Sequence, residues 1–412
     1  MRGMNTLTDN NQLEVAAPSQ LRVAVITETY PPEVNGVAIT IGHMVRVLRK
    51  RKHHIQLIRP RQHKQDAATQ DDGYEEVLLA GMPIPGYPEL KVGLPAKGAL
   101  LRLWRQQRPD IVHIATEGPL GWTALTAARK LGIPVSTDFH TNFHSYTKHY
   151  GIGLLKKPMA AYLRHLHNKA DCTMVPTSAL QHELEASRYE NVLVVPRGVD
   201  TRLFHPAKRS AALRSEWGVD DDTPVVMLVS RLAPEKNLPV VIRAFEEMRT
   251  IEPRCKLVIV GDGPARAELE RKQHPNVIFA GMRKQEDLAA HYASGDIFLY
   301  PSITETYGNV TVEAMSSGLA TIAYDYAAAH KHIRHDVNGL LVPYDDTASF
   351  IAQAKALVGD SARILRLRTE ARMTVESPTW EDVAGQLETV LVNLVSAQGA
   401  HHVESKLYTA AD

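Results

Sequence analysis

Short apolar runs rich in β-branched residues alternate with amphipathic segments along almost the whole chain. Because the runs are continuously apolar, they predict strands that are buried on both faces of parallel sheets. The segments between them predict helices that cross over as right-handed βαβ units. The predicted strands of the first half are Arg22–Ile26, Ile55–Arg59, Ile111–Ala115, Pro134–Thr137, Cys172–Pro176 and Val192–Val195. Those of the second half are Val225–Ser230, Lys256–Val260, Val277–Ala280, Ile297–Tyr300, Ala320–Ala323 and Gly339–Val342.

This order predicts an α/β protein with two facing, doubly wound Rossmann-like domains, and 412 residues are too many for one typical core. The predicted parts are a disordered tail 1–20, an N-terminal domain 21–205, a C-terminal domain 206–378, a helix 379–397 and a loose tail 398–412. The helix has one apolar face that could pack on either domain, with a return to the N-terminal domain as the candidate arrangement. That face consists of Val383, Leu387, Val390, Leu391 and Leu394.

Composition narrows the class of protein. A net charge of +1, from 47 basic and 46 acidic side chains, gives no reason to expect a nucleic-acid partner. Cys172 and Cys255 lie in apolar runs, so we expect buried free thiols and a reducing, cytoplasmic location. No apolar run reaches the length of a membrane span, and residues 1–20 lack the apolar centre of a signal peptide.

The stretch from Ile297 to Ala320 carries the strongest candidate chemistry. A predicted strand ends at Pro301, a polar turn carries Glu305, and Gly308 leads into a predicted helix that carries Glu313. Ligands of open α/β sheets bind at that edge of the sheet, and a helix N-terminus favours phosphate. Two carboxylates beside such a helix start suit a sugar nucleotide, although a glutamate in a first helical turn can also serve only the helix dipole.

Three other loops follow predicted strands and contain groups that suit a phosphate. Asn35-Gly36 can form a tight turn with open backbone N–H groups, or an ordinary βα turn. Arg231 and Lys236 suit a diphosphate, or are two solvated cations. Gly261 and Gly263 of G-D-G-P permit close backbone approach to a donor, but they lack the third glycine of the dinucleotide fingerprint.

Histidines gather after the predicted strand that ends at Thr137. His140 and His144 have the i, i+4 spacing of a zinc pair, but no further metal-binding motif accompanies them. A histidine just beyond a strand end is better explained as a group that contacts substrate. We therefore select His140 as a site residue and expect no metal.

Together these motifs resemble the retaining glycosyltransferases of family 4, which have the GT-B fold. The matching pieces run in the family's order over residues 22 to about 395. They are E-T-Y-P-P-E-V-N-G-V, F-H-T-N-F, S-R-L-A-P-E-K-N, G-D-G-P and P-S-I-T-E-T-Y-G-N-V-T-V-E-A-M-S-S-G. The resemblance implies a hexosyltransferase that uses a nucleotide sugar and requires neither metal nor cofactor.

The resemblance also implies a role for each matching residue. His140 would lie beside the transferred sugar, Arg231 and Lys236 would hold the donor diphosphate, Glu305 would bind sugar hydroxyls and Glu313 the ribose. The loop that faces donor phosphate and acceptor, and the backbone N–H groups that support sugar and phosphate, would come from Asn35, Gly36, Tyr307, Gly308, Asn309 and Val310. The family usually has Phe at position 307. A glycosidase would need two carboxylates flanking the scissile bond, so the resemblance disfavours a hydrolase.

The acceptor is suggested by a basic and apolar stretch, 148–169, which suits an anionic membrane surface or a core-facing helix with a solvated basic face. The motif variants resemble subgroups that glycosylate membrane lipids, including mannosyl-, glucosyl- and sulfoquinovosyl-transferases. We therefore expect transfer from GDP-mannose, or next from UDP-glucose, to a lipid hydroxyl by a protein peripheral to the inner face of the cytoplasmic membrane. The alternatives are a soluble sugar or polysaccharide acceptor, a sugar-nucleotide epimerase of the same fold, and a non-catalytic binding module.

Overall fold

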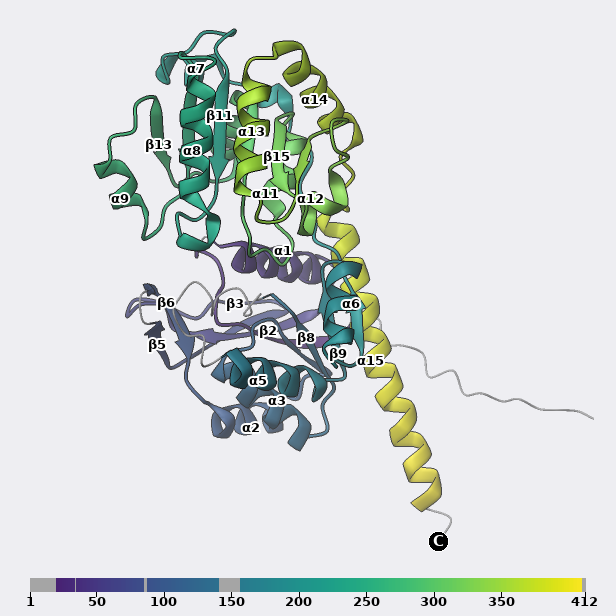
Figure 1. Ribbon diagram of the computed structural model, residues 1–412. Helices are drawn as coiled ribbons and strands as arrows, with labels where there is room; N and C mark the ends of the chain where they lie inside the picture. The colour runs from purple at the N-terminus through teal and green to yellow at the C-terminus, as the bar shows by residue number, and fades with distance from the viewer. Residues whose placement is uncertain (1–19, 34, 85–86, 141–155, 410–412) are drawn as a thin grey trace, which may run out of the picture.

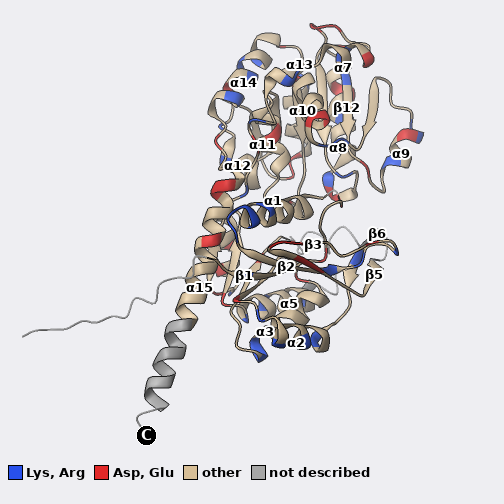
Figure 2. Ribbon diagram, turned by 180° about the vertical axis from the view of Figure 1, so that it is seen from behind, with Lys and Arg blue, Asp and Glu red and all other residues tan. Residues whose placement is uncertain are grey.

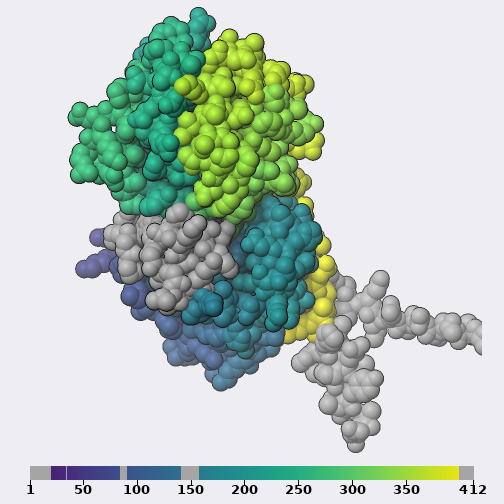
Figure 3. Space-filling view, viewed as in Figure 1, coloured from purple at the N-terminus to yellow at the C-terminus, as the bar shows by residue number. Residues whose placement is uncertain are grey.

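The computed structural model describes residues 20–33, 35–84, 87–140 and 156–409. The chain folds into two α/β domains, each built on its own mainly parallel sheet, with a long C-terminal helix along one side (Figure 1). The domains stand out as separate masses in the space-filling view (Figure 3). This is the predicted arrangement of two facing Rossmann-like domains.

The N-terminal sheet has the strand order β10-β9-β8-β7-β1-β2-β4-β3, and all neighbours are parallel except β3 and β4. Its strands are β1 (Arg22–Ile26), β2 (His54–Pro60), β3 (Gln70–Asp71), β4 (Tyr74–Leu79), β7 (Ile111–Ile114), β8 (Val135–Asp138), β9 (Cys172–Val175) and β10 (Val192–Val194). The helices are α1 (Gly36–Lys50), α2 (Lys97–Gln106), α3 (Pro119–Lys130), α5 (Lys156–Asn168) and α6 (Ser178–Ala186). A separate hairpin joins β5 (Gly81–Ile84) to β6 (Tyr87–Gly93).

Alternate side chains of β1 pack into two different hydrophobic cores, as expected for a strand that is covered on both faces. Val23 and Val25 pack with α1, whereas Ala24 and Ile26 pack with α2 and α3. Helix α1 has an apolar stripe of residues at i, i+3, i+4 and i+7 spacing, which places all four on the face that packs against the sheet. The stripe consists of Ile41, Met44, Val45 and Leu48.

The C-terminal sheet is entirely parallel, with the order β13-β12-β11-β14-β15-β16, which is the Rossmann order. Its strands are β11 (Val225–Val229), β12 (Lys256–Val260), β13 (Val277–Gly281), β14 (Ile297–Tyr300), β15 (Ala320–Tyr324) and β16 (Leu340–Val342). Its helices are η2 (Pro206–Lys208), α7 (Ala211–Glu216), η3 (Pro234–Lys236), α8 (Leu238–Arg249), α9 (Arg266–Arg271), α10 (Gln285–Ser294), α11 (Asn309–Ser316), α12 (Ala327–His332), α13 (Thr347–Val358) and α14 (Ser361–Thr374).

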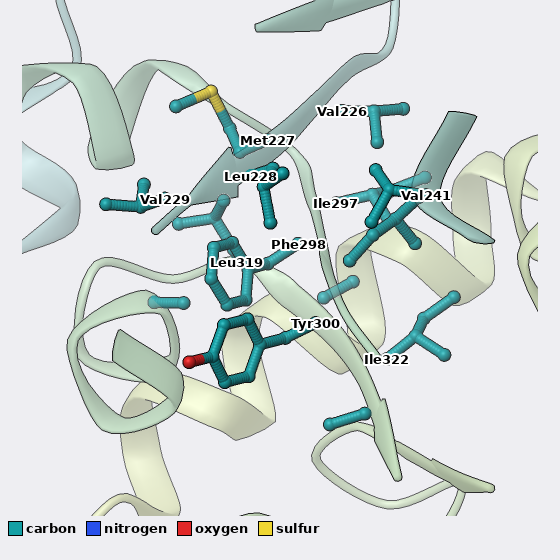
Figure 4. Close-up of a cluster of buried hydrophobic side chains, with 14 of the residues drawn as sticks. Val226, Met227, Leu228, Val229, Val241, Ile297, Phe298, Tyr300, Leu319 and Ile322 are labelled. Atoms are coloured by element: carbon teal, nitrogen blue, oxygen red, sulfur yellow. The ribbon is translucent and has the colours of Figure 1, made fainter. Parts of the chain in front are cut away.

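The core of this domain is centred on β11 and β14 (Figure 4). Val226, Leu228 and Phe298 are completely buried there. Tyr300, the last residue of β14, packs its ring at the edge of this cluster while its hydroxyl oxygen points away from it. The end of β14 is therefore where the apolar core gives way to polar chemistry.

All twelve predicted strands are present, but β3 to β6 were missed. These four strands contain charged residues, prolines and glycines, such as Glu75, Glu76 and Pro83, so they do not form continuous apolar runs. Strand β3 is an edge strand, β4 lies next to it, and β5 and β6 form the separate hairpin, where a strand need not be buried on both faces.

Helix α15 (Trp380–Thr409) returns to the N-terminal domain and packs beside α1. Trp380, Val383, Leu387 and Leu391 are buried in the core with the apolar stripe of α1. The prediction of a loose tail from residue 398 is wrong as far as 409, because the helix continues there. Gly385 and Gly399 both lie inside α15; an interior glycine weakens a helix by about 1 kcal/mol and need not end it.

Both cysteines are buried free thiols, as expected. Burial raises the pKa of Cys172 to about 12 and that of Cys255 to about 11. No helix among the described residues combines the length and apolar character that a membrane crossing requires.

Candidate active site

The candidate residues lie on loops at the carboxyl ends of the central strands of both sheets. In each sheet the strand order reverses beside the first strand of the domain, between β1 and β7 and between β11 and β14. Asn35 ends the loop after β1 and Gly36 begins α1, while Lys236 ends η3 after β11 and Glu305 lies on the loop after β14. Such reversal points are where open α/β sheets bind ligands.

Lys236 and Glu305 are brought into direct contact. The Lys236 ammonium forms an ion pair with Glu305 Oε1 and lies 3.5 Å from the Tyr300 hydroxyl oxygen. Glu305 Oε1 also accepts hydrogen bonds from Tyr300 (2.5 Å) and Ser302 (2.6 Å). The carboxylate therefore fixes the ammonium at the end of β14, and burial raises the pKa of Tyr300, which keeps its hydroxyl a donor.

Arg231 forms an ion pair with Glu235, a residue that is 1% exposed, while the Arg231 side chain itself is 30% exposed. The buried Glu235 carboxylate therefore fixes the Arg231 guanidinium, which is still partly accessible to solvent. Its loop leads directly into η3, which carries Lys236, so two cations follow one another on the loop after β11.

The two glycines of G-D-G-P make their close approach to the protein's own backbone. A Cβ at Gly261 would lie 1.9 Å from the Ser230 carbonyl oxygen, and one at Gly263 would lie 2.5 Å from that of Leu232. Both glycines also have positive φ, +133° and +156°. The two glycines therefore allow their loop to pack against the backbone of the Arg231 loop. Their direct contact with a donor stays a prediction.

Glu313 lies in α11, and its Oε2 accepts a hydrogen bond of 2.9 Å from the Tyr292 hydroxyl. Burial raises the pKa of Glu313 to about 7, although the Tyr292 hydrogen bond acts in the opposite direction. A half-buried carboxyl of this kind can change its protonation near neutral pH.

Helix α11 begins immediately after Gly308, whose φ of +89° lies in the left-handed region. The first N–H groups of a helix have no partner within it, so those of Asn309 and Val310 are available to an anion. Tyr307 directs its hydroxyl to His332 Nε2 at 2.9 Å, and burial raises its pKa to about 12. The hydroxyl that distinguishes Tyr307 from the family's usual Phe thus contacts α12 of the same domain.

Asn35 and Gly36 differ in how open they are to a ligand. Asn35 Oδ1 caps α1 by accepting from the Ala38 N–H (2.8 Å), and its amide donates to Thr29 (2.7 Å), so its side chain stabilises the loop. A Cβ at Gly36 would meet no described atom within 4 Å. The open approach in this loop is therefore at Gly36.

His140 is held by a buried cluster that the sequence did not reveal. Arg197 Nη2 donates to His140 Nδ1 at 3.2 Å, and His140 Nε2 lies 3.0 Å from Asp138 Oδ2. Because a guanidinium can only donate, Nδ1 accepts and the Nε2–H faces the carboxylate. Burial alone would raise the Asp138 pKa, but Arg197, His140 and His113 together hold it below its usual range.

The His140 ring therefore lies between Arg197 and Asp138, and its hydrogen bond to a sugar hydroxyl stays a prediction. Its backbone carbonyl accepts a 3.3 Å hydrogen bond from Thr306 of the other domain. Arg197 lies on the segment that crosses between the domains, close enough to Tyr307 for the two to interact electrostatically. His140 thus lies where the domains meet.

The residues missed by the sequence analysis are Asp138, Arg197, Tyr292, Tyr300 and Ser302. Asp138 ends a buried strand in the run S-T-D-F-H, and a carboxylate there could have indicated a partner. The other four have no local pattern that marks them. His144, the second member of the candidate zinc pair, lies outside the described residues. In the described part of the chain no three His, Cys, Asp or Glu side chains converge on a metal-sized site.

The basic and apolar stretch is described only from α5 onward. Met159 and Leu163 pack with Phe139 in a buried cluster, while Lys157, Arg164 and Lys169 are exposed. Within α5 the structure therefore matches a core-facing helix with a solvated basic face.

The contrast between two glycines gives a direct test of the site. We expect Gly36→Ala to leave the unfolding temperature unchanged but to weaken substrate use, because its methyl group would enter space that none of the described residues fills. We expect Gly261→Ala to destabilise the fold by several kcal/mol, because of the clash with Ser230 and the positive φ. Thermal unfolding and steady-state kinetics of both variants measure this. Equal unfolding temperatures for the two variants would contradict the assignment.

Two facing Rossmann-like domains, with cations and carboxylates at the reversal points of their sheets, define a GT-B glycosyltransferase. Residues 34–203 match the model "Glycosyltransferase Family 4", and residues 223–360 match "Glycosyl transferases group 1". A GDP-mannose-dependent alpha-mannosyltransferase of Mycolicibacterium smegmatis is 32% identical over 90% of this chain and 98% of its own. The chain belongs to glycosyltransferase family 4 and is a hexosyltransferase.

Two further similarities bear on acceptor and fold. Alpha-monoglucosyldiacylglycerol synthase of Streptococcus pneumoniae is 28% identical over 74% of this chain and 71% of its own. Sucrose-phosphate synthase from Thermosynechococcus elongatus superposes with a TM-score of 0.73 at 18% identity, covering 92% of this chain and 100% of that one. At this identity the second similarity shows the fold alone.

Proposed function

We propose that the protein transfers a hexose from a nucleotide sugar to a hydroxyl of a membrane glycolipid with retention of anomeric configuration. GDP-mannose is the favoured donor and UDP-glucose the next. The observation that carries the chemistry is the fixed Lys236–Glu305 pair beside the Arg231 loop. The names of the mannosyltransferase and the glucosyldiacylglycerol synthase favour this donor and a lipid acceptor.

In this proposal the bond between the anomeric carbon and the donor phosphate breaks, and a bond to the acceptor oxygen forms on the same face of the sugar. Arg231 and Lys236 stabilise the negative charge that grows on the leaving diphosphate, so no metal ion is required. The leaving phosphate accepts the acceptor's proton. Glu305 binds sugar hydroxyls, Glu313 the ribose, and the N–H groups of α11 the phosphate.

A donor assay tests the function. The purified protein is incubated with GDP-mannose or UDP-glucose, with or without vesicles that contain diacylglycerol or a glycolipid, and with EDTA in a parallel set. We expect lipid-linked hexose from GDP-mannose at an undiminished rate in EDTA. Product that forms only on a soluble sugar would favour the alternative acceptor. A new sugar nucleotide without acceptor would identify an epimerase and overturn the proposal.

The raised pKa of Glu313 predicts a pH dependence of nucleotide binding. The ionised carboxylate can accept from two ribose hydroxyls, and with a pKa of about 7 it is mostly protonated at pH 6 and mostly ionised at pH 8. We therefore expect GDP to bind about tenfold more tightly at pH 8 than at pH 6. Calorimetry with the wild type and Glu313→Gln measures this, since the variant retains only the titration of the nucleotide itself. The same slope in both proteins would contradict the role of Glu313.

The raised pKa of Glu313 affects folding stability in the opposite direction, because stability falls as pH rises. A carboxyl whose pKa is higher in the folded than in the unfolded state binds its proton more tightly when folded, so it lowers stability as pH rises from about 4.5 to 7. Glu313→Gln should flatten the fall in unfolding temperature over that range. This measurement needs no ligand and checks the pKa independently.

A further inference from the structure

A recess of about 540 Å³ lies on the N-terminal domain, along the C-terminal half of α1. Four cationic side chains line it, and Asp72 is its one carboxylate. The cations are Arg46, Arg49, Lys50 and Lys52. This end of α1 is coloured for Lys and Arg in Figure 2, beside α15. The volume is within the range of small-ligand sites, roughly 300–1,000 Å³.

The positive charge of this recess exceeds what the protein neutralises. Arg49 pairs with Asp71 at 3.2 Å, and Lys50 pairs with Glu381 at 3.5 Å. Among the described residues Arg46 and Lys52 form no ion pair. The helix dipole contributes only about half a negative charge at this end of α1. With Asp72 counted beside Asp71 and Glu381, the four cations leave about one positive charge, and the dipole offsets about half of it, so the recess stays net positive.

The walls contain groups suited to a phosphate. Arginine forks bind phosphate oxygens in pairs, and lysine adds a mobile point charge. His54 lines the recess and is exposed, so it can add a donor. Tyr30 also lines the recess, and burial raises the pKa of its hydroxyl, so the hydroxyl stays protonated and able to donate.

We propose that this recess binds a phosphate group, carried either by an anionic lipid headgroup or by a soluble phosphate. It is distinct from the active site, since it lies at the opposite end of α1 from Gly36. Tyr30 and Pro31 nevertheless belong to the loop that leads to Gly36, so a ligand in the recess would contact the far side of that loop. The proposal does not depend on the identity of donor or acceptor.

The test compares the full-length wild type with Arg46→Gln/Lys52→Gln. The matched control is Arg243→Gln/Arg271→Gln, which removes the same charge from two exposed arginines of the C-terminal domain. Each protein is sedimented with vesicles of phosphatidylcholine containing or lacking phosphatidylglycerol, and its thermal shift is measured with inorganic phosphate. Thermal unfolding without ligand is followed in parallel and should be equal in all three proteins.

We expect the recess variant to bind anionic vesicles about 30-fold more weakly than the wild type, because the loss of each of its two cations weakens binding about fivefold. The thermal shift by phosphate should disappear in that variant alone. Loss of both responses identifies a lipid headgroup as the ligand, and loss of the phosphate response alone identifies a soluble phosphate. Unchanged responses in the recess variant, or equal losses in the control, would overturn the proposal.

Discussion

Lys236→Met should lower kcat for hexose transfer about 10²- to 10³-fold, which is the usual cost of removing one group that stabilises developing negative charge. The Lys236 ammonium is held against Glu305 Oε1 before any substrate binds. No reorganisation is then needed as the diphosphate leaves, and the stabilisation is larger in the transition state than in the ground state. Steady-state kinetics should therefore show a fall in kcat that exceeds any rise in KM for the donor.

The fold should survive this change. Methionine retains the apolar stem of lysine, and Glu305 Oε1 still receives hydrogen bonds from Tyr300 and Ser302. The matched control is Lys355→Met on α13, where an exposed lysine pairs with Glu247 at 2.7 Å. Thermal unfolding of both variants should resemble that of the wild type. A kcat for Lys236→Met as high as for Lys355→Met would exclude Lys236 from charge stabilisation.

The central strands could be predicted because burial on both faces forces a continuous apolar run, as in Val225–Val229. Lys236 and Glu305 could be placed at one site for a related reason, since each follows such a strand and parallel strands end at the same edge. The sequence could not show which backbone approaches Gly261, because a glycine permits a close neighbour without identifying it. That neighbour is Ser230.

The partners of His140 could not be predicted, because tertiary folding alone brings them together. Arg197 lies 57 positions further along the chain, on the segment that crosses to the other domain. Nothing in its neighbourhood of P-R-G-V-D marks it as a partner of a histidine. Only the structure shows that Arg197 is 4% exposed and that Asp138 is completely buried.

Arg197→Met should destabilise the protein by about 3–5 kcal/mol, because it leaves the Asp138 carboxylate buried without its guanidinium. The double variant Arg197→Met/Asp138→Asn removes both charges and should recover most of that stability, since a neutral pair often replaces a buried ion pair at little cost. Urea unfolding of the single and double variants measures the recovery.

Activity should not recover with stability. The double variant still lacks the guanidinium that donates to His140 Nδ1, so the ring and the carbonyl that meets Thr306 lose their fixed orientation. Misplacement by about 1 Å can cost roughly 10²-fold in rate. We therefore expect kcat to stay about 10²-fold below wild type in a protein of near-normal stability, with a smaller change in donor KM. Arg197→Lys, which can still donate to Nδ1, should regain part of the rate. If kcat returned together with stability, Arg197 and Asp138 would support the fold only, and the orientation of His140 would not depend on them.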